Sequence, residues 1–299
     1  MKPRLILSVC LAVCVSFLNC SVGQAQTALD IQFNFAPDAD PTFAPLFENA
    51  AAVWEALLPS YQDGGQGFGF FGSDAGPVVV DAGVLAIDGG GGTLAQAAPT
   101  TGIVDNSGFF LAQSGILQFD SADINALTAQ GSLQDIIIHE LGHVLGFGTV
   151  WELNGVYDPA TSSATSVGEY TGSFGLATYN QEFGLNENFI PIENNGGPGT
   201  ADAHFDEEFF GVALNNNSTV APGTRFGPNQ AEILTGFFNA SLGTTFSDTT
   251  LATFQDIGFN VDFAALEEFN NPSAVPEPGS VAALTMFGLI WMRRRRRSV

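Results

Sequence analysis

The chain has 299 residues, of which 31 are acidic and only eight are lysine or arginine, giving a net charge of −23. Residues 27–274 contain 30 acidic residues and a single basic one, Arg225, so this region alone carries a net charge of −29. Such a charge excludes nucleic acid and anionic lipid surfaces as partners of this region. It suits a protein that must stay soluble in a salty medium, or one that binds cations or cationic substrates.

The first 26 residues have the composition of a secretory signal peptide. Lys2 and Arg4 precede an apolar run over 5–18, and residues 23–25 offer a small-residue cleavage site. The apolar run is short for a membrane anchor, so we expect export with cleavage. All three cysteines lie in this segment. The rest of the chain would therefore have no disulfide and no thiol to bind a metal.

Residues 27–150 contain the periodic patterns of an α+β region. Apolar and polar residues alternate over 28–35, which predicts a half-buried strand. Apolar residues recur at helical spacing over 45–58 and predict a helix that ends at the following proline. Further strands are predicted over 78–87 and 115–119. The glycine run between them lacks the lysine of a phosphate-binding loop, so we expect a mobile loop there.

A helix is predicted next, from Leu133 to Leu145. Ser132, followed three residues later by Asp135, is typical of a helix N-terminal cap, and Gly146 is typical of a helix end.

This predicted helix contains the sequence 139-HELGHVLGFG-148. His139 and His143 are four residues apart and project from one face, so both rings can reach one metal ion at roughly 2.0–2.1 Å. Glu140 is offset from the first histidine, which suits a general base that lies beside the metal without binding it. The motif also arises by chance, but two of the chain's three histidines fall within it.

A catalytic zinc site needs three protein ligands and one open position. A third histidine three residues after Gly146 would stand at position 149, which is Thr149. His204, within 196-GGPGTADAHFDEEFFG-211, is the only other histidine and therefore the only candidate for a three-histidine site. The glycines and Pro198 in that segment suit a chain that turns sharply and approaches a metal closely.

From residue 151 onward the periodicity weakens. Residues 154–250 are rich in Gly, Asn, Ser and Thr, which predicts an irregular region with short elements. A final strand is predicted over 257–263. We therefore divide the chain into an upper lobe over 27–150 and a lower lobe over 151–270.

The last segment, 271–299, begins as a linker and continues with 275-VPEPGS-280, an apolar run over 281–292 and five arginines. An ordinary C-terminal anchor would share the apolar run and the basic end. The combination with Pro-Glu-Pro resembles the PEP-CTERM sorting signal of Gram-negative bacteria. That resemblance implies an exosortase-type sorting enzyme as a partner and delivery to the cell envelope or extracellular matrix. We expect a short transmembrane segment over 281–292, and transient membrane contact through both ends of the chain.

The sequence over roughly 29–264, which is nearly the whole of the region between the two end segments, resembles the leishmanolysin-like branch of the metzincin zinc metallopeptidases. The matching segments are 29-LDIQFNF-35, 93-TLAQA-97, 115-GILQFDSADI-124, 139-HELGHVLGFGTVWE-152, 190-IPIENNGGPGTADAHFDEEFFG-211, 232-EILTG-236 and 251-LATFQDIGF-259. The resemblance implies an α+β, metzincin-like zincin fold, with a twisted mixed sheet and the active-site helix in the upper lobe. It also implies one Zn²⁺ bound by His139, His143 and His204, with Glu140 as the catalytic base and Gly146 at the point where the chain leaves the helix.

The chain departs from this family at one position beneath the metal. The family has a methionine in a segment like ELMTG, whereas 232-EILTG-236 has Leu234 there. Leucine is close to methionine in volume, so we expect the site to keep its geometry.

Acidic clusters at Asp120 with Asp123, and at Asp206 with Glu207 and Glu208, raise the question of a Ca²⁺ site. No EF-hand pattern is present, so a solvated acidic surface is the simpler interpretation of both clusters. Asp206 offers a further possibility, since a carboxylate can orient a ligand histidine.

The leading functional hypothesis is an exported zinc endopeptidase whose substrate is a protein or peptide. One alternative is an extracellular matrix or surface structural protein built on a degenerate peptidase scaffold. Another is an enzyme that uses the same zinc geometry on a non-peptide amide or ester.

Overall fold

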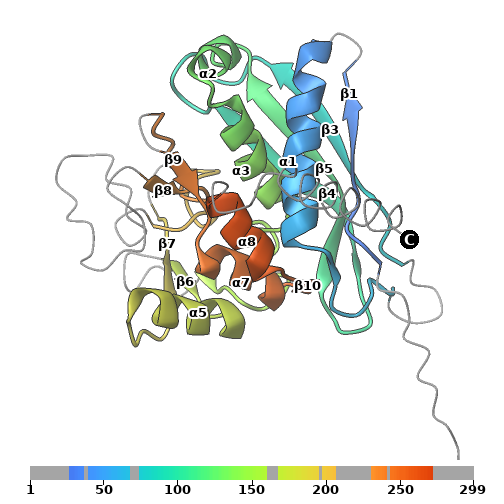
Figure 1. The fold of residues 1–299 in the computed structure, drawn as a ribbon, viewed down its shortest axis with the longest axis vertical. Coiled ribbons are helices and arrows are strands. Elements are labelled where there is room, and N and C mark those ends of the chain that lie inside the picture. Colours follow the sequence, from blue (N-terminus) through green and yellow to red (C-terminus); the bar gives the residue numbers. More distant parts are fainter. Residues whose placement is uncertain are drawn as a thin grey trace, which may run out of the picture.

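The computed structural model describes residues 27–36, 40–67, 74–159, 168–194, 197–206, 230–240 and 243–271. These residues form a mixed α+β arrangement, as expected, in which a sheet stands beside two long helices and shorter elements gather below (Figure 1). The expected signal peptide and sorting signal lie outside the described residues.

The main sheet has four strands in the order β1–β3–β5–β4. Their bounds are β1 Ile31–Phe35, β3 Val78–Leu85, β4 Ala95–Val104 and β5 Phe110–Asp120. β1, β3 and β5 run parallel, and β4 pairs antiparallel with β5 at one edge, which confirms the mixed sheet. The sequence analysis missed β4, because its Gln, Thr, Pro and Gly residues hide the apolar alternation, and it began β5 five residues too late.

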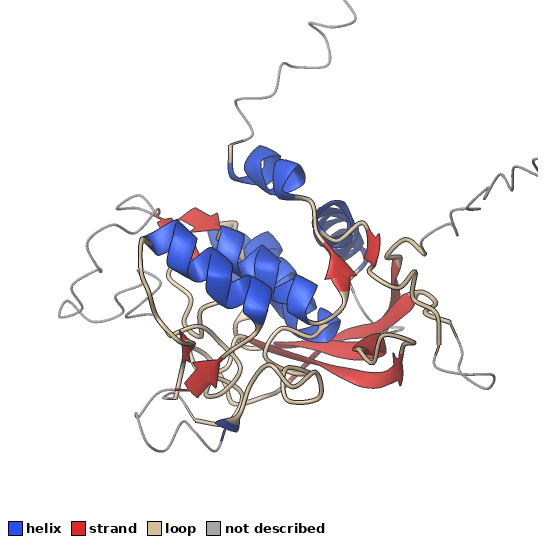
Figure 2. Cartoon of the chain, turned by 90° about the horizontal axis from the view of Figure 1, so that it is seen from below, coloured by secondary structure: helices blue, strands red, loops and turns tan. Residues whose placement is uncertain are grey.

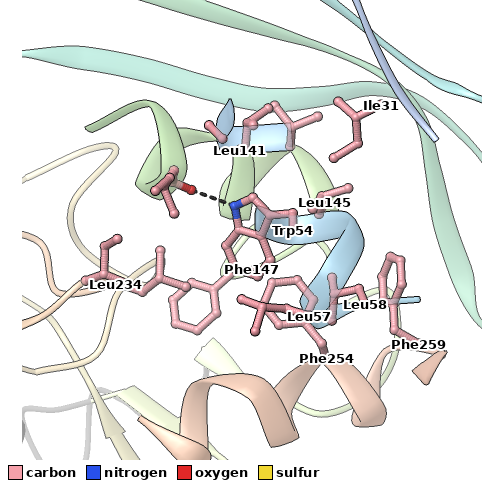
Figure 3. Packing of buried hydrophobic residues seen from close by; sticks show 14 of the residues in the cluster. Ile31, Trp54, Leu57, Leu58, Leu141, Leu145, Phe147, Leu234, Phe254 and Phe259 are labelled. Atoms are coloured by element: carbon pink, nitrogen blue, oxygen red, sulfur yellow. Dashed lines mark hydrogen bonds between the residues drawn. The ribbon is translucent and has the colours of Figure 1, made fainter. Parts of the chain in front are cut away.

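Two helices pack against each other beside the sheet. α1 spans Ala44–Leu57 and α3 spans Leu133–Leu145, each within one residue of its predicted bounds. α3 also contacts β4 and β5, and Figure 2 shows the sheet on one side of the molecule with the helices on the other. The apolar face predicted for α1 is buried, and at its centre the Trp54 indole donates a hydrogen bond to the Ile138 carbonyl at 2.8 Å (Figure 3).

The entry to α3 differs from the prediction. Ser132 is the N-cap residue, but its side chain makes no capping hydrogen bond. The reason is its backbone conformation, φ −93° and ψ −7°, whereas a capping residue is normally extended. The chain reaches Ser132 directly from α2 (Ile124–Gln130), a helix that the sequence analysis missed.

The lower region consists of short elements, as expected, but it contains more helix than predicted. Its helices are α5 Ser173–Phe183, α7 Asp248–Asp256 and α8 Phe263–Asn270. Its strands are β6 Gly168–Tyr170, β7 Ile190–Ile192, β8 Gln230–Glu232, β9 Gly243–Thr245 and β10 Phe259–Asn260. They form the pairs β6–β7, β8–β9 and β10–β2, where β2 is Ser60–Tyr61. A 3₁₀ turn, η1 (Pro41–Phe43), precedes α1.

The strand predicted over 257–263 is therefore mostly wrong. Only Phe259 and Asn260 belong to a strand, because Asp262 caps α8 by accepting hydrogen bonds from the backbone of Ala264 and Ala265. A single apolar core nevertheless joins the two regions, since the Trp54 ring packs against Phe246 and Phe254.

The expectation of a membrane-spanning segment needs correction. None of the helices in the described residues is both long enough and apolar enough to cross a bilayer. The stretch over 281–292 lies outside the described residues. As a helix its 12 residues would reach only about 18 Å, against a hydrocarbon core of about 30 Å.

Candidate metal centre

Three histidine side chains meet between α3 and a segment of the lower region. His139 and His143 project from the last two turns of α3, and His204 approaches them from the opposite side. Their Nε2 atoms form a nearly equilateral triangle, with separations of 3.0 Å (139 to 143), 3.1 Å (139 to 204) and 2.9 Å (143 to 204). The expected convergence of the three imidazoles is thus observed across 61 residues of intervening chain.

The backbone around His204 is fixed by strand-like hydrogen bonds on both sides. The His204 carbonyl accepts from the Glu193 N–H at 2.9 Å, beside β7. The next N–H, of Phe205, donates to the Leu234 carbonyl at 3.2 Å. A ligand from an irregular region is therefore placed by backbone pairing with two other segments.

Each histidine ring has its second nitrogen occupied by a backbone carbonyl. The Nδ1 atoms of His139, His143 and His204 bond to the carbonyl oxygens of Ile233, Phe147 and Thr200, at 2.6, 2.9 and 2.9 Å, respectively. Because a carbonyl can only accept, these contacts assign the proton of each neutral ring to Nδ1. All three Nε2 atoms then present lone pairs toward one another, an arrangement that a cation between them would stabilise.

The triangle has the dimensions of a metal site. Three nitrogens that bind one ion at 2.0–2.1 Å in tetrahedral directions lie about 3.3 Å apart. The observed 2.9–3.1 Å is close to that value. His143 and His204 are buried, whereas His139 is partly exposed, so access from solvent is on the His139 side. The three histidines could therefore hold a metal ion with a position left for another ligand.

The electrostatics keep the rings neutral. Burial lowers the pKa of His139, and burial together with the neighbouring rings lowers the pKa of His143 well below its ordinary value. Burial, followed by the effect of His139, lowers the pKa of His204 to about 3. Protons therefore compete poorly with a metal for these nitrogens at neutral pH.

Glu140, the predicted base, follows His139 directly on α3. It is buried, and burial raises the pKa of its carboxyl to about 8. Among the described residues it has no ion-pair or hydrogen-bond partner to favour the charged form. A cation held by the adjacent histidines would lower this pKa and ionise the carboxyl.

Leu234 stands at the position where the peptidases that the sequence resembles have methionine. It is fully buried, and its side chain packs so closely on Gly142 that a β-carbon there would lie 3.1 Å from it. Gly142 stands between the two histidines on α3, and the Ile233 carbonyl before Leu234 accepts from His139. The leucine thus supports the floor of the site by packing alone.

The residues after α3 bring His204 close to the helix, and sequence reasoning missed how they do so. Gly146 ends the helix with φ +123°, as the resemblance implied. Gly148 has φ +72°, and a β-carbon there would collide with the Ala203 carbonyl. Thr149, in place of a third histidine, donates its hydroxyl to the His143 carbonyl at 2.7 Å. The only available signal was the glycine spacing, which cannot identify Ala203 as the partner.

The acidic clusters do not behave as predicted. Asp120 and Asp123 are buried, so the interpretation as a solvated surface is wrong for them. The Asp120 carboxylate accepts the backbone N–H groups of Ile87, Asp88 and Gly89, and hydrogen bonds from the backbone, that of Ala122 foremost, lower its pKa to about 2. Asp120 therefore holds the start of the glycine run that was expected to be mobile, and Asp123 Oδ1 accepts from the Gly91 N–H at 2.9 Å.

The second cluster is only partly described. Asp206 is buried, but the ring Nδ1 atoms of the three histidines all bond backbone carbonyls, so Asp206 does not orient a ligand histidine. Glu207 and Glu208 lie outside the described residues.

Comparison with known proteins found no family model that matches the sequence and no curated protein similar to it.

Proposed function

We propose that this protein is a zinc-dependent endopeptidase with a metzincin-like site. The observation that carries the proposal is the triangle of three unprotonated Nε2 atoms beside a buried glutamate that has no partner among the described residues. Histidine nitrogens suit zinc, and three protein ligands with one open position are typical of catalytic rather than structural zinc sites. The resemblance of 139-HELGHVLGFG-148 and 232-EILTG-236 to the leishmanolysin-like peptidases supports the same assignment.

In this proposal the protein's own residues perform two tasks. His139, His143 and His204 bind the ion, and the carbonyls of Ile233, Phe147 and Thr200 keep the three rings in place. When bound, zinc supplies Lewis acidity, which lowers the pKa of water toward about 7 and polarises a carbonyl group.

Glu140 carries the proton. Its carboxylate accepts a proton from the attacking water, whose oxygen bonds to the carbonyl carbon of the peptide. The same carboxyl then delivers that proton to the nitrogen as the C–N bond breaks. Glu140 is offset by one residue from His139 on α3, so it can reach the water without occupying a ligand position.

The negative charge of the chain supports a preference for basic peptides. Residues 27–274 carry a net charge of −29, and electrostatic attraction raises the rate at which cationic substrates arrive. Equal turnover of acidic and basic peptides of the same length at low salt would contradict this preference.

The decisive experiment measures zinc content and casein hydrolysis of the purified protein, with and without a chelator. We expect one zinc per chain and activity that is lost on chelation and restored by zinc. Glu140→Gln should retain zinc and fold while losing at least 100-fold in turnover, because the general base is gone. Glu48→Gln, on exposed surface of α1, is the matched control and should keep full activity.

Each alternative has its own outcome. Stoichiometric zinc without hydrolysis of protein, peptide, amide or ester substrates would favour the surface or matrix structural protein. Hydrolysis of small esters or amides but not of peptides would favour the non-peptide hydrolase. A His204→Ala variant that still binds one zinc as tightly as the parent would contradict the ligand assignment.

We further propose that the protein is exported and delivered to the cell envelope or matrix by an exosortase-type enzyme. The proposal rests on residues 1–26 and on 275-VPEPGS-280 with its basic end. Determining both termini of the protein recovered from cells tests it, because export and sorting should remove the two segments.

A further inference from the structure

Two carboxyl groups, each with one buried oxygen, come from the turn between β4 and β5 and from the loop over 61–67. Asp105 directly follows β4 and is completely buried. One of its oxygens, Oδ1, accepts the backbone N–H groups of Ser107 and Phe109, at 3.0 and 2.8 Å. Its other oxygen, Oδ2, is buried and has no hydrogen-bond partner in the part of the chain that the structure describes.

Asp63, in the neighbouring loop, is half-buried and has a carboxyl oxygen in the same situation. Its Oδ2 is also buried and without a hydrogen-bond partner among the described residues. The loop is fixed beside the turn, because the Asn106 N–H donates to the Gln66 carbonyl at 2.9 Å and Gly67 pairs with Asp105. Burial raises the pKa of Asp105, and the negative charge of Asp63 raises it further against the hydrogen bonds from the turn, so the two carboxyls act on each other.

No side chain among the described residues can neutralise this pair. Residues 27–36, 40–67, 74–159, 168–194, 197–206, 230–240 and 243–271 contain no lysine and no arginine. Neither Oδ2 receives a hydrogen bond from a donor group in these ranges. An unpaired buried carboxylate oxygen is costly, and two that interact are costlier still.

We propose that Asp63 and Asp105 bind a calcium ion that ties the loop over 61–67 to the β4–β5 turn. Oxygen donors select a hard cation, and calcium accepts irregular sets of carboxylates, backbone carbonyls and waters. Magnesium demands a stricter octahedral shell and keeps more of its water, so it suits this irregular loop less well. The ion would connect the edge of the main sheet with the segment that pairs β2 to β10.

A calcium titration followed by thermal unfolding tests the proposal. The full-length protein is stripped with chelator and then titrated with CaCl₂ at constant ionic strength, with MgCl₂ in a parallel series. We expect the melting temperature to rise and to saturate, with half-saturation at about 10⁻⁴–10⁻³ M as in extracellular calcium modules. Asp105→Asn and Asp63→Asn should each weaken calcium binding at least 10-fold.

The controls separate a bound ion from general charge screening. Asp81→Asn removes one exposed carboxylate from β3 and should keep the saturable calcium response. Asp105→Asn keeps the Oδ1 acceptor and removes the buried charge, so without calcium it should be at least as stable as the parent. His204→Ala should respond to calcium normally, because the histidines take no part.

Two results would overturn the proposal. A parent protein whose melting temperature shows no saturable rise with calcium would show that water alone completes the site. A calcium response that persists unchanged in both asparagine variants would place the ion elsewhere. Neither result depends on proteolytic activity, so the zinc proposal stands or falls separately.

Discussion

Residues 27–150 are positioned by apolar packing, whereas residues 151–271 depend on buried carboxylates that accept hydrogen bonds from backbone N–H groups. In the upper region α1 and α3 are amphipathic, and Trp54, Ile137 and Leu141 of their facing sides are fully buried. Asp120 shows that the upper region also uses a buried carboxylate, but there it fixes a loop and not a helix.

In the lower region three buried or largely buried acidic side chains meet the beginnings of helices. Asp256 accepts from the N–H groups of Phe174 and Gly175 at the start of α5. Glu182 and Glu232 accept from N–H groups at the start of α7. Since the described residues contain no lysine or arginine, helix N-termini take the role that basic side chains have in other proteins. A strongly acidic chain can thus bury carboxylates without salt bridges.

Substitution at the junction of the two regions should reduce stability the most. Gly148→Ala would place a β-carbon against the Ala203 carbonyl at a residue whose φ is +72°. The added strain and overpacking should cost about 4 kcal/mol and displace His204, so zinc affinity should fall as well. Urea unfolding and a zinc-competition titration would measure the two effects.

Gly155→Ala is the matched control. Gly155 also has a left-handed conformation, φ +69°, but its β-carbon would meet nothing within 4 Å. Only the backbone preference is lost, so the cost should be about 1 kcal/mol with zinc affinity unchanged. Equal losses in the two variants would mean that the approach of residue 203 to α3 is unimportant.

The next largest effect should come from the carboxylate beneath α5. Asp256→Ala leaves the N–H groups of Phe174 and Gly175 without an acceptor, and it leaves the Tyr170 hydroxyl with only the Thr253 carbonyl at 3.4 Å. Leaving these partly buried donors unsatisfied should cost about 3 kcal/mol in the free energy of unfolding, measured by chemical denaturation. The exposed Asp81→Asn should change it by less than about 0.5 kcal/mol. If Asp256→Ala lost no more stability than Asp81→Asn, the distinction between the two regions would be contradicted.

Glu232 should make the lower region sensitive to pH. Burial raises its pKa to about 7, opposed by hydrogen bonds from Thr250 and Ser247. Because the folded-state pKa exceeds the ordinary value of 4.5, folding favours the protonated form. The loss of unfolding free energy caused by burying Glu232 is therefore absent below about pH 4.5, grows as pH rises, and levels off above about pH 7.

Glu232→Gln should remove that dependence. Between pH 5 and pH 8 the parent should lose about 2 kcal/mol more stability than the variant, measured as the difference in unfolding free energy at each pH. Glu48→Gln, at an exposed position, should follow the parent at both pH values. Parallel curves for Glu232→Gln and the parent would show that this carboxyl ionises in the folded protein as it does in the unfolded chain.

The difference between the regions also explains what could be predicted from sequence. α1 and α3 were located within a residue because apolar periodicity over 13 or 14 residues is a strong local signal. The ligand pair His139 and His143 follows from the same periodicity. β4 was missed because its sequence has no clear alternation, and α2 was missed because its seven residues are too few for a clear apolar period.

The rest depends on contacts between distant residues. His204 was identified as a candidate because histidine is scarce and because glycines and Pro198 surround it, but its placement requires pairing with Glu193 and Leu234. The three carbonyls that orient the rings belong to the backbone. Every residue has such a carbonyl, so residue type cannot identify these three. The first N–H groups of α5 and α7 donate to carboxylates from other segments of the chain. A local sequence pattern therefore cannot by itself predict where these helices begin.

The smallest expected changes in stability come from two serines at helix starts. They test whether a helix start is fixed by a hydrogen bond or by apolar packing. Ser247 caps α7, with its hydroxyl accepting from the Thr250 N–H at 2.9 Å, whereas Ser132 at the start of α3 makes no such bond. Ser247→Ala should cost about 1 kcal/mol in unfolding free energy, and Ser132→Ala less than about 0.5 kcal/mol. Both serines are buried, so the difference reflects the capping bond and not exposure. If Ser132→Ala proved as costly as Ser247→Ala, α3 would depend on a local sequence signal after all, and its position could not be attributed to apolar packing alone.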